Sequence, residues 1–152
     1  MSRARATILL DGRASDAEAV WYDTARWPEF VDGLERVHDV GGGWPQVGGT
    51  VVWDPHPGGR GRVTERVTAY EARRGQESEV ADDEITGVQR ISFVPQGGRV
   101  AVTLELEYRI VRRNPFTPVV DALFVRGAQR ASLARTLQQF RRAVAAAPAA
   151  AH

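Results

Sequence analysis

The sequence predicts an α+β fold in which a curved antiparallel sheet of about six to seven strands wraps around one long C-terminal helix. Residues 114–147 carry apolar side chains at three- and four-residue steps, the pattern of an amphipathic helix of about 30 residues. Residues 99–110 alternate between apolar and polar side chains, the pattern of a strand with one buried face. A long helix with one apolar face needs a large apolar surface to cover it, and the strands supply that surface.

Length and composition indicate one ordinary globular domain, which we expect at residues 1–147, followed by a disordered Ala/Pro tail at 148–152. The chain has no cysteine and no lysine, so a disulfide framework, a thiolate metal site and Schiff-base chemistry are excluded. The net charge of +1 gives no electrostatic reason to expect nucleic acid or an anionic membrane surface as a partner. No signal peptide and no apolar run of roughly 18 residues is found, so we expect no membrane span and a cytoplasmic location.

The first part of the chain is expected to form one strand, two short helices and two further strands. The first strand is predicted at residues 4–10. Ser15 and Glu18 have the spacing of a capping box, which predicts a short helix that begins there, and a second helical piece surrounds Trp27. Glycine-rich turns then separate two strands, at 37–40 and 50–54.

From residue 61 onward the pattern is nearly continuous strand. Residues 62–71 alternate so that one face, taken as the inner one, carries Val63, Glu65, Val67 and Ala69. The polar segment 76–81 is expected to be an outer strand, and a hairpin at 95–98 joins strands at 85–94 and 99–110. The last strand should turn inward Val100, Val102, Leu104, Leu106, Tyr108 and Ile110.

The long helix is expected to begin with Thr117 as its N-cap and Pro118 at the first helical position. Its apolar stripe is predicted from side chains recurring at three- and four-residue steps: Val120, Leu123, Phe124, Gly127, Ala131, Ala134, Leu137, Phe140 and Val144. This stripe is expected to face the strands.

Several strings in this order resemble the START-like superfamily, which includes the birch pollen allergen, START lipid-transfer domains and bacterial polyketide cyclases. The matching strings are Ala19-Val20-Trp21, Trp27-Pro28-Glu29-Phe30, Gly48-Gly49-Thr50-Val51-Val52-Trp53, Gly97-Gly98-Arg99-Val100 and Val119-Val120-Asp121-Ala122-Leu123-Phe124-Val125-Arg126. The last resembles the final helix of the polyketide cyclase/dehydrase and lipid transport branch. The resemblance covers essentially the whole chain and implies the helix-grip fold, with a deep, mostly apolar cavity for lipids, polyketides or other hydrophobic molecules.

In the aromatase/cyclase members of this superfamily, the strand that corresponds to residues 62–71 carries inward aromatic residues, a serine and an essential arginine. The serine and the arginine do not carry over to the expected inner face here, which puts that chemistry in doubt. A slip of one residue in register would instead turn Thr64 and Arg66 inward.

Glu65 is the candidate catalytic residue, because it falls on the apolar face of a strand that should line the cavity. Loss of water would raise the pKa of its carboxyl and suit it to general acid or base catalysis. The alternative is an ion pair near the rim with an arginine such as Arg62 or Arg90.

Ligand-binding residues are expected among the side chains that face the space between sheet and helix: Trp27, Phe30, Trp44, Trp53, Val63, Val67, Phe93, Leu104, Leu106, Tyr108, Val120, Phe124 and Gly127. For the aromatic members, plain core packing is the competing interpretation. Asp54 and His56 lack a third ligand, so no metal is expected. The glycine stretches match neither a phosphate loop nor a dinucleotide fingerprint, so no cofactor is expected.

Three functions stay open at this point. The first is binding or carriage of a hydrophobic small molecule by a monomer or homodimer, and an apolar lining favours it. The second is an enzyme of the cyclase, aromatase or dehydratase type, favoured by a buried carboxylate near a second polar group. The third is a protein-interaction module, favoured by a collapsed cavity beside an exposed apolar patch.

Overall fold

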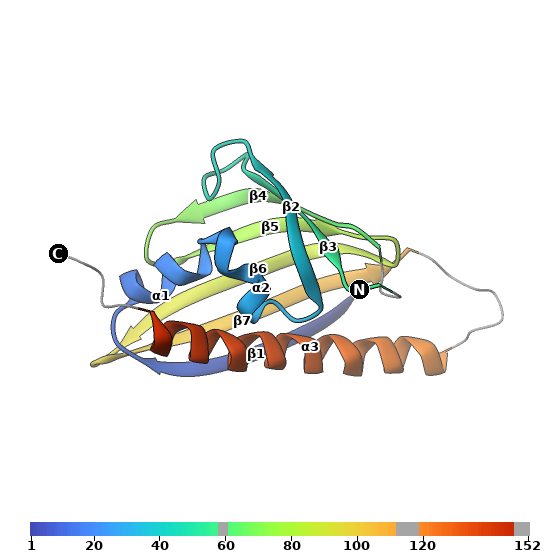
Figure 1. Cartoon of the computed structure of the whole chain (residues 1–152). Helices are drawn as coiled ribbons and strands as arrows, with labels where there is room; N and C mark the ends of the chain where they lie inside the picture. Colours follow the sequence, from blue (N-terminus) through green and yellow to red (C-terminus); the bar gives the residue numbers. More distant parts are fainter. Residues whose placement is uncertain (58–60, 112–118, 148–152) are drawn as a thin grey trace.

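The computed structural model describes residues 1–57, 61–111 and 119–147, and within the last segment the side chains from 128 onward. Seven strands and one long helix dominate it (Figure 1). The elements are β1 (Ser2–Asp11), α1 (Ala14–Trp21), the 3-10 helix η1 (Thr24–Arg26), α2 (Trp27–Phe30), β2 (Leu34–Gly41), β3 (Thr50–Pro55), β4 (Val63–Glu71), β5 (Gly75–Ala81), β6 (Ile85–Gln96), β7 (Arg99–Ile110) and α3 (Val119–Ala146).

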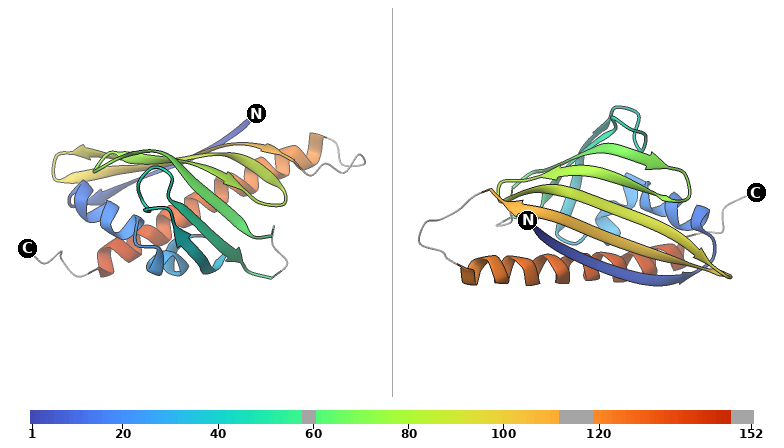
Figure 2. Two further views of the ribbon diagram at one scale, coloured as in Figure 1. Left: turned by 90° about the horizontal axis from the view of Figure 1, so that it is seen from above. Right: turned by 180° about the vertical axis from the view of Figure 1, so that it is seen from behind.

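The strands form a single antiparallel sheet in the order β1-β7-β6-β5-β4-β3-β2. The sheet curves, and α1, α2 and α3 all lie on one side of it (Figure 2). α3 runs alongside β1, and α1 packs near the C-terminal end of α3 (Figure 1). The predicted fold class, a curved antiparallel sheet around a long C-terminal helix with short helices after the first strand, is confirmed.

The predicted alternation of β7 is confirmed, with Val100, Val102, Leu104, Leu106 and Tyr108 buried on one face. In β4, Val63, Glu65 and Val67 are buried as expected, whereas Thr64 and Arg66 are exposed, so the slipped register is excluded. A register shift between Val67 and Ala69 then ends the alternation. Ala69 is therefore exposed, contrary to the prediction.

Two local predictions are wrong. The first helix begins at Ala14 with Arg13 as its N-cap, and no side chain caps it, so Ser15 and Glu18 form no capping box. Glu18 instead accepts a hydrogen bond of 2.6 Å from the backbone N–H of Arg73, because the turn between β4 and β5 lies beside α1. The polar strand β5 is central, not outer. Its outward charge at Glu77 is paired with Arg90 of the neighbouring strand, so a polar sequence is compatible with a central position.

The buried face of α3 is rotated relative to the prediction. Ala131 and Ala134, expected in the apolar stripe, are exposed. Larger side chains determine which face packs on the sheet, since two alanines offer little apolar area. The buried positions are Gln129, Leu133, Thr136, Leu137, Phe140 and Ala143. The expected cap at Thr117 and Pro118 lies outside the described residues.

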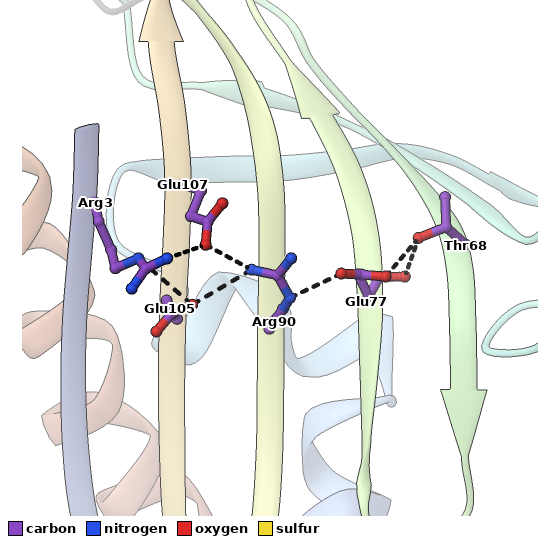
Figure 3. Close-up of polar contacts among 6 residues, drawn as sticks. All are labelled: Arg3, Thr68, Glu77, Arg90, Glu105 and Glu107. Carbon is purple, nitrogen blue, oxygen red and sulfur yellow. Dashed lines mark hydrogen bonds and ion pairs between the residues drawn. The ribbon is translucent and has the colours of Figure 1, made fainter. Parts of the chain in front are cut away.

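The outer face of the sheet carries charged side chains that cross it from strand to strand (Figure 3). Arg90 of β6 donates to Glu77 of β5 at 2.7 Å and to Glu105 and Glu107 of β7 at 3.3 and 3.2 Å. Arg3 of β1 also binds Glu107. These side chains are partly or largely exposed, so each pair contributes little to stability. This face is therefore the one in contact with solvent, and the functional site has to be sought on the inner face.

Candidate ligand-binding site

An open groove of about 490 Å³ lies between α3 and the end of β3. Its rim is polar and its inner wall is aromatic. On the rim stand Asp32, His56, Glu84, Ser132 and Arg135, and the indole of Trp53 forms the inner wall. This volume falls within the range of about 300–1,000 Å³ typical of small-molecule sites.

The rim is held in place by Asp32, which follows α2. Arg135 of α3 donates two hydrogen bonds of 3.0 Å to its carboxylate, and Ser132 donates a third of 2.8 Å. The backbone N–H of Asp32 donates to the hydroxyl of Thr136 at 2.9 Å. These contacts fix the segment after α2 to α3, so the width of the groove is set by side chains about one hundred residues apart in the sequence.

A second, smaller hollow of about 30 Å³ lies further inside, over the inner face of β4 to β7. Its walls include Trp53, Glu65, Gln89, Ile85 and Leu106. Trp53 lines both the groove and this inner pocket, so its side chain stands between them. The two hollows share Trp53 in their linings, and the lining of the inner one also includes the carboxylate of Glu65.

Trp53 and Glu65 are joined by a buried hydrogen bond. The indole Nε1–H of Trp53 donates to Oε2 of Glu65 at 2.7 Å, and the two residues are only 3% and 7% exposed. They meet because both point inward from adjacent strands, where Trp53 pairs with Val63 and Glu65 pairs with Val51. A carboxylate in this position can accept hydrogen bonds from a ligand and can take up or release a proton.

The two arginines considered as rim partners of Glu65 serve other carboxylates. Arg62 donates to Asp54 at 2.8 Å, and Arg90 lies on the outer face with Glu77. Arg36 also binds Asp54, at 3.0 Å. The hydrogen bond from Arg62, supported by that from Arg36, holds the pKa of Asp54 below its usual value. Asp54 is thus engaged in ion pairs, while His56 stands on the groove rim.

The other aromatic residues expected to bind ligand gather in a separate cluster near α1. Their ring centroids are 5.5 Å apart for Trp27 and Trp44, 5.2 Å for Phe30 and Phe140, and 6.2 Å for Tyr22 and Phe93. The indole nitrogens of Trp27 and Trp44 donate to the backbone carbonyls of Trp21 and Tyr22. These side chains fill the interior at this end, in the way that buried aromatic residues commonly pack.

The hydroxyl of Tyr22 is buried in this aromatic cluster and has no hydrogen-bond partner in the part of the chain that the structure describes. Burial, reinforced by Tyr70 and Glu18, raises the pKa of Tyr22 well above its usual range. The ring of Tyr70 lies 5.6 Å from that of Tyr22, which places it on the inner side of the sheet after the register shift in β4.

The remaining candidates divide into three groups. Val63 and Leu106 line the inner pocket. Val67, Leu104 and Tyr108 are buried on the inner face of the sheet without lining either hollow. The side chains of Val120, Phe124 and Gly127 lie outside the described residues.

The sequence did not single out Gln89 or the rim residues Asp32, Glu84, Ser132 and Arg135, and it considered the rim residue His56 only as a metal ligand. Gln89 shares the inward alternation of Ile91 and Phe93 in β6, and this signal could have identified it. The association of Asp32 with Ser132 and Arg135 depends on the tertiary fold and leaves no local pattern. Across the described residues, no helix is both long and apolar enough to cross a membrane.

Comparison with known proteins places these features in context. The family model described as polyketide cyclase / dehydrase and lipid transport matches residues 1–145. No curated protein matches the chain.

Among solved structures, a conserved protein from Geobacillus kaustophilus superposes with a TM-score of 0.74 at 10% identity, over 95% of each chain. The di-domain ARO/CYC StfQ of the steffimycin biosynthetic pathway superposes with a TM-score of 0.75 at 14% identity, over 92% of this chain and 50% of the StfQ chain. Norcoclaurine synthase from Thalictrum flavum, in complex with dopamine and hydroxybenzaldehyde, superposes with a TM-score of 0.69 at 15% identity. The match covers 97% of this chain and 88% of the norcoclaurine synthase chain. At these identities the likeness shows a shared fold.

Proposed function

Because the chain belongs to the polyketide cyclase/dehydrase and lipid transport family, a family that fits a hydrophobic ligand-binding fold, we propose that it binds a hydrophobic small molecule in the groove between α3 and β3. The observation that carries this proposal is the position of Trp53, which lines the groove on one side and the inner pocket on the other. The small exposed edge of its indole gives the groove an aromatic floor, and Pro55, Pro57 and Ala128 in the same lining add apolar contact for a ligand.

The chemistry of the walls supports a ligand with one apolar and one polar part. Charged side chains such as Asp32 and Arg135 stand at the rim, and the same lining includes the apolar side chains of Pro55, Pro57 and Ala128. One structural neighbour favours a ring-shaped ligand for this chain, because norcoclaurine synthase is described in complex with the aromatic molecules dopamine and hydroxybenzaldehyde.

The proposal is tested by titrating the protein with a fluorescent anilinonaphthalene dye. We expect saturable binding with micromolar affinity and competition by fatty acids or polycyclic aromatic compounds. Ala128→Trp should abolish binding by filling the groove, because Ala128 lines it from α3. Ala134→Trp is the matched control, since Ala134 is exposed on the same helix and does not line the groove.

Two results would contradict this function. Equal dye binding by Ala128→Trp and the unchanged protein would place the site elsewhere. No saturable binding at all would favour the protein-interaction module instead. Native mass spectrometry of protein purified from its own host would then reveal whether a small molecule accompanies the chain.

A second candidate is an enzyme in which Glu65 moves a proton to or from the bound molecule. The buried position of its carboxylate at the inner end of the site favours this candidate. The role requires a pKa above the usual value of about 4.3, so that the carboxyl can exchange a proton near neutral pH. Glu65→Gln should then abolish turnover and leave the affinity for the dye unchanged. An NMR titration that gives Glu65 a pKa at or below about 4.3 would exclude Glu65 as the group that moves the proton.

A further inference from the structure

An uncharged patch interrupts the charges on the outer face of the sheet. The patch consists of two neighbouring rows of side chains that cross β1, β7 and β6: Leu9, Ala101 and Val94 in one row, and Thr7, Thr103 and Ser92 in the other. Leu9 and Val94 are 39% and 51% exposed, and the hydroxyls of Thr7 and Thr103 lie 3.0 Å apart in a hydrogen bond. The pairing of these two hydroxyls lowers the cost of covering the patch with another surface.

A charged row borders the patch on each side. The row nearer the turn between β6 and β7 consists of Asp11, Arg99 and Gln96, and the row on the other side consists of Arg5, Glu105 and Arg90. The charges of the two rows are opposite in sign at β1, where Asp11 and Arg5 stand, and again at β7, where Arg99 and Glu105 stand. Because each row directly follows the patch, the two rows are equally far from its centre.

A second copy of the chain can cover this patch with its own. Two sheets that pack face to face lie about 10 Å apart, and a homodimer of this kind has a two-fold axis between them. When that axis crosses the strands above the centre of the patch, each strand lies over its own counterpart in reverse direction. Asp11 then faces Arg5 of the partner subunit, and Arg99 faces Glu105 of the partner subunit. Symmetry repeats each of these contacts, so opposite charges meet at four places.

The same charges disfavour the alternative arrangement, in which the axis runs along the strands. Each row would then lie over itself, so that Glu105 faces Glu105 of the partner subunit and Arg99 faces Arg99 of the partner subunit. Like charges placed opposite each other repel and exclude such a contact. The charge pattern around the patch therefore selects one way of stacking two copies.

We propose that the chain forms a weak homodimer through the uncharged patch, with the two-fold axis across the strands and the charged rows of the two copies in contact. The four rows of three side chains supply twelve side chains from each copy, fewer than the roughly 20–30 of a standard interface. We therefore expect a dissociation constant on the order of 100 µM. The helices lie on the other side of the sheet (Figure 2), so the dimer leaves the proposed ligand site uncovered.

Sedimentation velocity of the full chain tests the association. Below and above about 100 µM, we expect the sedimentation coefficient to rise with concentration from that of a monomer toward that of a dimer. Ala101→Glu should abolish this rise, because it places a charge in the middle of the patch. Thr86→Glu is the matched control, since Thr86 lies on the same face of the sheet beside Arg109, outside the four rows.

An exchange of charges tests the predicted contacts. Arg5→Asp places an acid opposite Asp11 of the partner subunit, and Asp11→Arg places a base opposite Arg5 of the partner subunit. Each change should weaken dimerisation on the order of tenfold, because the contact occurs twice. The double variant Arg5→Asp/Asp11→Arg should regain most of the affinity. Within one copy the two positions are about 20 Å apart along β1, so the recovery can only come from contact between copies.

Engineered cysteines test the register of the two copies, because the chain has none of its own. Residue 101 is expected to face residue 103 of the partner subunit. A mixture of Ala101→Cys and Thr103→Cys should therefore form disulfides between the two variants under mild oxidation. Each variant alone should form them more slowly.

The outcomes separate this inference from the proposed function, which does not depend on it. A monomer at every concentration would overturn the dimer. Association that survives Ala101→Glu, or a double variant that binds no better than the single ones, would overturn this interface. Faster cross-linking of each cysteine variant with itself would overturn the direction of the two-fold axis.

Discussion

The indole of Trp53 donates a buried hydrogen bond of 2.7 Å to the carboxylate of Glu65 on the adjacent strand. This bond connects the wall of the groove to the wall of the inner pocket, because Trp53 borders both hollows and Glu65 borders the inner one. A ligand that competes for the carboxylate must therefore also affect the indole. The two residues form the structural centre of the proposed site.

A double-mutant cycle measures this connection. Trp53→Phe removes the N–H donor and Glu65→Leu removes the carboxylate that accepts from it, and each change alone should lower the free energy of unfolding. Because a hydrogen bond to a charged group contributes about 1.5–3 kcal/mol, we expect a coupling energy of that order between the two changes. Urea unfolding of the four proteins measures it. Strictly additive effects would show that the bond contributes nothing.

The packing of the sheet against α3 is tested at Leu104, which is only 2% exposed on the inner face of β7. Leu104→Asp should lower the free energy of unfolding by at least about 3 kcal/mol, because it buries an unpaired charge. Val94→Asp is the control, since Val94 is 51% exposed on the neighbouring strand and should cost less than about 0.5 kcal/mol. Similar stability of the two variants would contradict the observed register of β7.

The ion pairs of Asp54 predict a dependence of stability on pH. Arg62 first, and Arg36 in addition, hold the folded-state pKa of Asp54 below its usual value of 3.8. The stabilisation is therefore complete above pH 3.8 and is lost as the pH falls through the folded-state pKa. Asp54→Asn should be less stable than the unchanged protein at neutral pH, and this difference should shrink in acid.

Urea unfolding between neutral and strongly acidic pH measures that difference. Asp11→Asn provides a control, because the side chain of Asp11 is 96% exposed beside Arg99 and its change should have little effect at any pH. A difference between Asp54→Asn and the unchanged protein that grows on acidification would contradict the assignment of these ion pairs.

The buried hydroxyl of Tyr22 predicts behaviour at high pH. Burial raises its folded-state pKa above the usual 10.0, so the folded protein resists its ionisation. The unfolded chain ionises first, and stability falls as the pH rises above 10.0. In an absorbance titration, Tyr22 should ionise only when the protein unfolds.

Tyr22→Phe should remove this late transition. Because the hydroxyl has no partner among the described residues, the variant should be as stable at neutral pH as the unchanged protein, or more stable by up to about 1 kcal/mol. A marked loss of stability at neutral pH would indicate that the hydroxyl is hydrogen-bonded.

The sequence predicted those parts of the fold in which one regular pattern decides the structure. The strict alternation at 99–110 gave the bounds of β7 and its inward residues, and the same argument placed Glu65 on the inner face. The buried face of α3 was harder to predict, because an alanine such as Ala131 matches the pattern of an apolar stripe and is also stable when exposed to solvent. The central position of β5 was missed because its outward charges find partners only in the folded sheet.

The site was predictable only in part. Trp53 and Glu65 were identified as candidates, yet no local pattern relates them to each other or to Gln89. The clamp between Asp32 and Arg135 joins residues 103 positions apart, so only the folded chain brings them together. A polar residue within a strand is also a weak signal, because the sequence does not reveal whether its partner is a neighbouring strand, water or a ligand.

The most direct test of the central claim observes the indole N–H of Trp53 by NMR while the anilinonaphthalene dye is added. The protein contains four tryptophans, so the side-chain spectrum is simple and Trp53→Phe assigns its signal. We expect the Trp53 signal to shift saturably, with the dissociation constant obtained from the dye titration, while the signals of Trp27 and Trp44 in the aromatic cluster stay in place. Saturable binding that shifts Trp27 or Trp44 and leaves Trp53 unmoved would contradict a site between α3 and β3.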